Sequence, residues 1–157
     1  MKAKDKKLLL HLFETHFQKY NISIYLSDEK RTNEIIASWR QHFIPTTLNH
    51  KESLWHTFSY KYQKHLSQEN AILKFDKTYL KKFIIFSDTK YYALECLVLA
   101  NIDLQNILKY DILIKILETA PCLLDIYICH MNYAWTFVIP HEIELGPYFS
   151  ISSNHSN

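Results

Sequence analysis

The chain has 157 residues, of which 48% are hydrophobic, 15% aromatic and 22% charged, a composition that is typical of one globular domain and excludes a disordered polypeptide. Its formal net charge is +2, yet residues 91–157 carry two basic and seven acidic residues, so the last third has a net charge of −5. The sequence contains no apolar run of the ~18 residues that a membrane helix needs, and Met1–Lys7 is not followed by the long apolar segment of a signal peptide, so we expect a cytoplasmic protein.

Hydrophobic spacings of three and four residues predict helices in six stretches. These are residues 4–20, a segment capped by Ser27 or Asp28 and ended by Pro45, a turn around Trp55 and Phe58, a short helix after Ser67, one that begins at Asp103, and one over residues 111–118. Alternating apolar and polar residues, or short apolar runs, predict strands at residues 22–26, 83–86, 91–99, 125–130 and 133–139. Four of these strands form two hairpins, with turns at residues 87–90 and at Met131 and Asn132.

Helices early in the chain and hairpins later predict an α+β fold with a mostly antiparallel sheet of about five strands, packed by the N-terminal and connecting helices. A doubly wound parallel sheet is disfavoured because it needs glycine-rich turns, and Gly146 is the only glycine. Residues 1–149 are expected to form a single domain, and the polar residues 150–157 a flexible tail. Gly146 precedes Pro147 in a turn that lets Tyr148 and Phe149 return to the sheet.

His56, His141 and Glu142 are the candidate catalytic residues. An imidazole beside a carboxylate suits acid–base chemistry, so a small hydrolase-type enzyme is one alternative for the function. Adjacent side chains on an extended chain point to opposite faces, however, which disfavours joint action of His141 and Glu142 on one substrate atom. The enzyme hypothesis therefore requires His56 to meet His141 in one pocket.

The sequence indicates no metal site and no cofactor. None of the nine histidines lies four residues from another, and Cys96, Cys122 and Cys129 match no metal-binding spacing, so we expect these cysteines to be reduced apolar fillers. A glycine-rich phosphate loop is excluded by the glycine count. The basic run at residues 77–82, with Tyr79 inside it, makes nucleic-acid binding a second alternative, although such runs are more often solvated surface.

Four blocks of the chain resemble a family of small bacterial proteins known only as a domain of unknown function. The blocks are Leu-Trp-His-x-Phe-Ser-Tyr at residues 54–60, Trp-Thr-aromatic-Val at 135–138, His-Glu at 141–142 and Gly-Pro-Tyr-Phe at 146–149. The resemblance covers roughly residues 22–149. Pro140 stands where that family often has threonine, and the segment at residues 109–123 is longer than the family pattern. The resemblance implies a shared fold but no established activity and no catalytic residues.

Without a coherent catalytic or cofactor motif, the chain is best interpreted as a non-enzymatic bacterial binding protein. The most plausible role is that of an immunity protein that neutralises a cognate toxin domain, and the acidic last third suits a basic partner such as a nuclease. The acidic residues expected to bind this partner are Glu95, Asp103, Asp111, Glu118 and Asp125. The sequence leaves the oligomeric state open.

Overall fold

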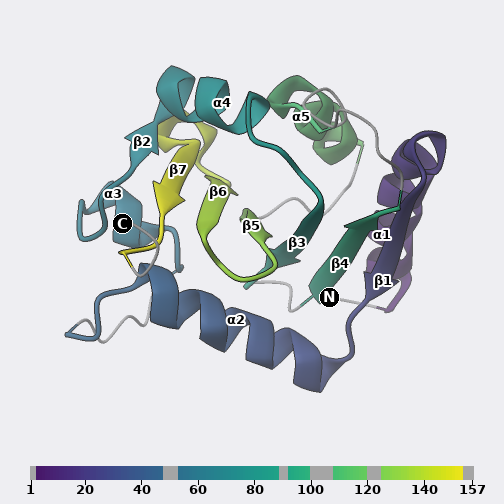
Figure 1. Cartoon of the computed structure of the whole chain (residues 1–157), viewed down its shortest axis with the longest axis horizontal. Helices are drawn as coiled ribbons and strands as arrows, with labels where there is room; N and C mark the ends of the chain where they lie inside the picture. The colour runs from purple at the N-terminus through teal and green to yellow at the C-terminus, as the bar shows by residue number, and fades with distance from the viewer. Residues whose placement is uncertain (1–2, 48–52, 89–91, 100–107, 120–124, 154–157) are drawn as a thin grey trace.

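The computed structural model describes residues 3–47, 53–88, 92–99, 108–119 and 125–153 (Figure 1). Its helices are α1 (Ala3–Phe17), the 3-10 turn η1 (Gln18–Tyr20), α2 (Glu29–Phe43), α3 (His56–Ser59), α4 (Gln68–Asp76), α5 (Tyr110–Glu118) and the 3-10 turn η3 (Ile143–Leu145). Its strands are β1 (Ile22–Leu26), β2 (Leu66–Ser67), β3 (Lys82–Ser87), β4 (Tyr92–Val98), β5 (Ile126–His130), β6 (Trp135–Ile139) and β7 (Tyr148–Ile151). The helix expected from Asp103 lies outside the described residues.

The α+β prediction is confirmed, but the sheet is larger than the sequence suggests. It has seven strands in the order β1-β4-β3-β5-β6-β7-β2, and every neighbouring pair is antiparallel. Both predicted hairpins and the early strand are present, and the two additional strands are β2 and β7. Both additional strands are too short to show a clear alternation of residues, which is why the estimate of about five was too low.

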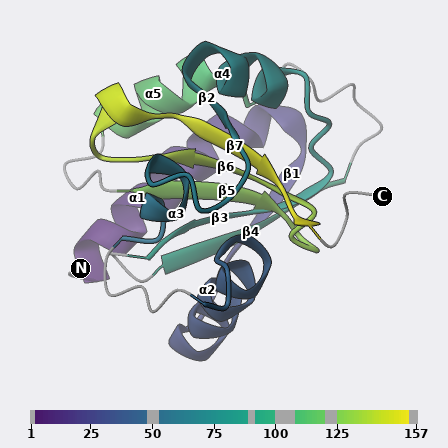
Figure 2. The same cartoon turned by 90° about the vertical axis from the view of Figure 1, so that its left-hand side faces the viewer.

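Helices cover both faces of the sheet, as Figure 2 shows for α4 and α5 above the strands and α2 below them. The apolar run of strand β3 is buried on both faces of the sheet. Phe83 and Ile85 belong to one core, and Ile84 and Phe86 belong to the other. Successive side chains of a strand point to opposite faces, so a strand buried on both sides is apolar throughout. The result is a three-layer arrangement with two separate hydrophobic cores.

The first core packs α1, α4 and α5 against the sheet. Phe13 and Phe17, one helical turn apart, form the buried stripe of α1, and Phe75 of α4 stacks on Phe137 at a centroid distance of 4.1 Å. Phe17 is central to this core, because its ring packs edge-to-face with that of Phe83 at a centroid distance of 6.1 Å.

The second core is built around Trp39 of α2, which is fully buried against Phe43, Phe58, Phe86 and Tyr127. The indole Nε1–H donates to Thr136 Oγ1 at 2.9 Å, so the buried donor is satisfied. Helix α2 begins after Asp28, whose carboxylate accepts from the backbone N–H of Arg31 at 2.7 Å, and it ends before Pro45, as predicted.

The flexible tail expected at residues 150–157 includes residues that the structure places in a strand. Ser150 and Ile151 belong to β7, where they pair with Thr136 and Trp135 of β6. Ser152 is also buried, and its backbone N–H donates to Ala134 O at 2.9 Å. This polar segment pairs with the apolar strand β6. Its own sequence does not reveal that pairing, because strand formation depends on the neighbouring strand.

Candidate functional site

A short exposed loop joins β6 to β7 and forms the most distinctive surface feature of the described residues. All five residues of the segment 141–145 are exposed, although Pro140 before it and Pro147 after it are buried. The side chains of Ile143 and Leu145 are 57% and 46% exposed. Glu142 and Glu144 alternate with them along the chain, so two large apolar side chains lie on the surface among carboxylates.

A buried carboxylate anchors the start of this loop. Asp125, just before β5, is 0% exposed, and its Oδ1 accepts from both the backbone N–H and the Nδ1 of His141 at 2.8 Å each. A carbonyl or carboxylate oxygen only accepts, so this contact places the ring proton on Nδ1. The His141 side chain is 41% exposed, with Nε2 3.7 Å from Glu142 Oε1. The double contact holds the loop against β5.

The end of the loop is held by Gly146 and by backbone hydrogen bonds. Leu145 N–H donates to Glu142 O at 2.9 Å, and Gly146 N–H donates to Ile143 O at 3.3 Å. The peptide bond between Gly146 and Pro147 is cis. Gly146 lies so close to the Pro140 ring that an added Cβ would be 2.5 Å from Pro140 Cδ. The loop therefore closes on itself, with its two ends in contact.

Helix α5 lies beside this loop, as Figure 2 shows. Residues of both line a hollow of about 100 Å³. Its lining is mostly apolar: Ile114 and Leu117 from α5, Ile126, Ile139, Pro140 and Ile143, together with Glu118 and His141. Asp111 and Glu118 of α5 are exposed. The exposed residues of the loop and of α5, on either side of this apolar hollow, are called here the α5–loop surface.

The five acidic residues predicted to bind a partner do not share this surface. Asp111 and Glu118 lie on it, and Asp103 lies outside the described residues. Asp125 is completely buried, so a partner protein cannot reach it in this fold.

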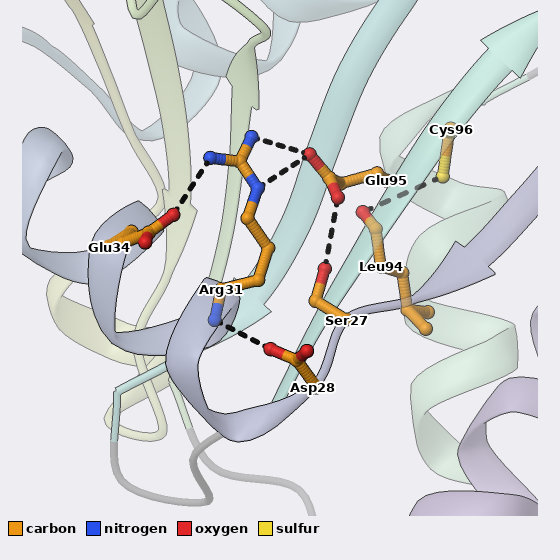
Figure 3. Close-up of polar contacts among 7 residues, drawn as sticks. All are labelled: Ser27, Asp28, Arg31, Glu34, Leu94, Glu95 and Cys96. Atoms are coloured by element: carbon orange, nitrogen blue, oxygen red, sulfur yellow. Dashed lines mark hydrogen bonds and ion pairs between the residues drawn. The ribbon is translucent and has the colours of Figure 1, made fainter.

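Glu95, the remaining predicted binding residue, forms an internal ion pair (Figure 3). Its Oε1 accepts from Nε and Nη2 of Arg31 at 3.1 and 2.6 Å, and its Oε2 accepts from Ser27 Oγ at 3.2 Å. The hydrogen bond to Glu95 raises the pKa of Arg31 above its ordinary value. Glu95 therefore ties β4 to the start of α2 and is not available as an open carboxylate.

The structure places two of the candidate catalytic residues, His56 and His141, against one indole ring. The ring of Trp55 lies 4.2 Å from that of His56 and 5.9 Å from that of His141, measured between centroids. His56 also stacks on Tyr60 at 5.1 Å. Both histidines thus contact the Trp55 indole, and their meeting in one pocket, which the enzyme hypothesis requires, stays untested.

Buried polar groups continue this cluster beneath Trp55. Tyr127 Oη accepts from Trp55 N–H at 3.0 Å, and Asp88 Oδ2 accepts from Leu54 N–H at 3.1 Å. Burial, followed by the negative charges of Asp88 and Asp125, raises the pKa of Tyr127 well above its ordinary value. Tyr127 therefore stays a neutral phenol, and these contacts fix α3 against β5.

The cluster lacks an activated nucleophile within the part of the chain that the structure describes. His141 makes its hydrogen bonds and ion pairs to Asp125 and Glu142, with no hydroxyl or thiol among its described partners. Cys96 and Cys129 are buried free thiols, and burial raises the pKa of both above the ordinary value of 9.0. They match the prediction of apolar fillers, while Cys122 lies outside the described residues. The geometry suits orientation of the loop better than covalent catalysis.

Other expectations concern metal ions, membranes and nucleic acid. Among the described residues, no three His, Cys, Asp or Glu side chains gather closely enough to hold a metal ion. No described helix combines the length and the apolar character that crossing a bilayer requires. Lys77 and Lys81 between α4 and β3, and Lys82 at the start of β3, are exposed, and Tyr79 among them is 50% exposed. Nucleic-acid binding by this run stays a prediction.

Sequence reasoning missed Ile143, Glu144 and Leu145. A signal was available, because this alternation of apolar and acidic residues lies between two chain-stiffening prolines, Pro140 and Pro147. Such a pattern also suits an edge strand, in which the isoleucine and leucine would be buried. Only the fold shows that both side chains face solvent.

Together the fold and the site define a class: α+β proteins with an antiparallel sheet between two helical layers and an acidic, apolar-centred loop at the end of β6. Within that class, the chain belongs to the family described as Domain of unknown function (DUF4275), whose model matches residues 11–149. No curated protein and no solved structure matches the chain. The match extends the resemblance toward the N-terminus, to include the last seven residues of α1.

Proposed function

We propose that this protein is a non-enzymatic binding protein, an immunity protein that neutralises a cognate toxin domain through the α5–loop surface. The observation that supports the proposal best is the exposure of Ile143 and Leu145 on a loop whose two ends are held in place. An apolar centre within a polar rim is the usual arrangement of a protein–protein interface.

The energetics of this surface favour association with a protein. Full burial of an isoleucine or leucine side chain contributes about 1.5–3 kcal/mol, and both side chains here are roughly half exposed before binding. The loop is already closed by backbone hydrogen bonds, so little conformational entropy remains to be lost on binding. The proposal therefore predicts a partner with an apolar pocket that receives Ile143 or Leu145.

The carboxylates define the charge of the partner. Asp111, Glu118, Glu142 and Glu144 are exposed on or beside the apolar centre. They would accelerate encounter with a basic protein and disfavour acidic partners. A toxin domain that acts on nucleic acid has a basic active site, which this surface would complement.

The test is co-purification with the product of the neighbouring gene, followed by titration of the purified pair. We expect a stable complex, protection of cells that express the toxin domain, and at least a tenfold rise in the dissociation constant for the double variant Ile143→Ala, Leu145→Ala. Leu73→Ala is the matched control, because Leu73 on α4 is 49% exposed and lies outside this surface. The absence of both complex and protection with the wild-type chain would contradict the proposal.

A hydrolase is the second candidate, and one observation favours it. Asp125 orients the imidazole of His141 through Nδ1, which leaves Nε2 as the potential proton acceptor on the exposed side of the contact. Hydrolysis of p-nitrophenyl esters by the purified protein, lost in His141→Gln and retained in His11→Gln, would support this candidate. Equal rates for the wild-type chain and His141→Gln would rule it out.

A further inference from the structure

A second hollow, of about 720 Å³, lies at the sheet edge where β2 meets β7. One wall is the chain segment at residues 63–66, the other is β7 with Ser153 after it, and Lys74 of α4 completes the lining. This β2–β7 groove shares no lining residue with the hollow beside α5. Its volume lies within the range of about 300–1,000 Å³ that small-molecule sites occupy.

The groove exists because the pairing of β2 with β7 stops after two residues. Leu66 pairs with Phe149 and Ser67 with Tyr148, and no further pair is present in the described ladder. One residue further, Ser150 Oγ donates to Lys64 O at 2.7 Å, so a side chain bridges the two segments. Before Leu66 the two segments are therefore joined by a side chain and not by ladder pairs, and both line the hollow.

The wall formed by residues 63–66 is held firmly. His65 Nδ1 donates to Gln63 O at 2.7 Å, and the His65 ring meets the rings of Tyr148 and Phe58 edge-on at 5.2 and 5.7 Å. These contacts belong to the second core, so the wall rests on the folded interior. A groove with a fixed wall binds a ligand with a smaller loss of conformational entropy than a loose loop does.

The charge of the groove is positive and uncompensated. Lys64 and Lys74 both line it, His65 adds a titratable imidazole, and no acidic side chain is among the described lining residues. Both lysines are exposed, and neither forms an ion pair with an acidic residue in the described parts of the chain. Two ammonium groups over one hollow, with serine and glutamine donors beside them, attract an anion.

The groove also has an apolar side. Leu66 is 42% exposed and Ile151 is 48% exposed, and Phe149 contributes to the lining beneath them. Inorganic phosphate would leave these side chains in contact with water, whereas a ligand with a hydrocarbon body would cover them. Small-molecule sites combine an apolar lining with a few polar groups in this way.

We propose that the β2–β7 groove binds an amphipathic organic anion, a carboxylate or sulfonate carried on an aromatic or aliphatic body. Lys64 and Lys74 hold the anionic group, and Leu66 and Ile151 cover the apolar body. This site is independent of the α5–loop surface and of its proposed partner.

The experiment is a fluorescence titration of the full chain with two probes of similar shape. One is 8-anilinonaphthalene-1-sulfonate, and the other is N-phenyl-1-naphthylamine, which has the same aromatic body without the sulfonate. We expect the sulfonate probe to bind at least tenfold more tightly than the neutral one. The double variant Lys64→Gln, Lys74→Gln should weaken sulfonate binding at least tenfold and leave the neutral probe within twofold. Leu66→Ser should weaken both probes at least threefold.

Matched controls separate the groove from other surfaces. The double variant Lys77→Gln, Lys81→Gln removes the same charge from exposed lysines outside the groove, and Ile143→Ala, Leu145→Ala removes the apolar centre beside α5. Both controls should keep the sulfonate affinity within twofold of the wild-type value. Equal affinity of the two probes, or sulfonate binding that is unchanged by Lys64→Gln, Lys74→Gln, would overturn the proposal. Binding only after removal of residues 154–157 would also overturn it, because the chain itself would then occupy the groove.

Discussion

Gly146 is the position at which a single methyl group tests the described packing most directly. In Gly146→Ala the added Cβ would lie 2.5 Å from Pro140 Cδ and 2.7 Å from Pro140 Cγ. Packed carbon atoms ordinarily lie about 3.5–4.0 Å apart, so the methyl group is about 1 Å too close. The backbone at Gly146 has φ −120° and ψ −160°, which alanine adopts without strain. The expected cost therefore comes from the contact alone.

The size of the destabilisation follows from the rigidity of the Pro140 ring. Overpacking costs about 1–3 kcal/mol, and a proline ring cannot rotate away, so the upper end of that range applies. Alanine also lowers the conformational entropy of the unfolded chain, which offsets about 0.5 kcal/mol of this destabilisation. We expect Gly146→Ala to lower the free energy of unfolding by about 2–3 kcal/mol, which corresponds to a fall in Tm of about 5–10 °C for a chain of this length.

Urea denaturation followed by tryptophan fluorescence measures this change, because Trp39 and Trp55 are buried in the fold. Pro140→Ala supplies the control, since it removes both ring carbons that the new methyl group meets. In the double variant Gly146→Ala, Pro140→Ala, the glycine substitution should cost less than about 0.5 kcal/mol. A Gly146→Ala variant as stable as the wild-type chain, or a cost that persists in the double variant, would refute the described contact.

Three further predictions concern the core, the termini of helices and pH. Thr136→Val leaves the buried indole N–H of Trp39 without its acceptor and should cost about 1–3 kcal/mol by urea denaturation, and less in a Trp39→Phe background. Asp28→Ala removes the cap of α2 and should cost about 1 kcal/mol; a loss of thermal stability of less than 1 °C would contradict it. Burial raises the pKa of the Cys96 and Cys129 thiols above 9.0, so the folded state keeps protons that the unfolded state releases, and the free energy of unfolding should fall as pH rises above about 9. Cys129→Ala should reduce that slope by up to about 1.4 kcal/mol per pH unit in denaturation series at pH 8–10.5, and an unchanged slope would contradict buried thiols.

Local sequence signals determined most of the helices and both hairpins. Asp28 and Pro45 act within one turn of the backbone, which is why the bounds of α2 were predictable from the sequence. The hairpin of β3 and β4 also forms between neighbours in the chain, and its strands carry their own apolar signal. Gly146 was predicted to be structural, and the Pro140 ring beside it supplies the reason.

The tertiary structure decided which residues are buried and which are exposed at the candidate site. Asp125 looks like a surface carboxylate in the sequence, but β5 carries it inside, where His141 compensates the buried acceptor. Ile143 and Leu145 look like core residues, but the closed loop leaves them in solvent. Burial depends on what packs against a side chain, and that neighbour is often distant in sequence.

The same reason explains the sheet edge. Leu66 pairs with Phe149 across more than half of the chain, and two residues of ladder leave no periodic signal in either segment. The amino-acid sequence by itself thus determined the elements whose partners are local and the composition of both cores. Strand order, the groove beside β7 and the exposed loop arise only when distant segments pack, because they are set by long-range contacts that no local pattern encodes.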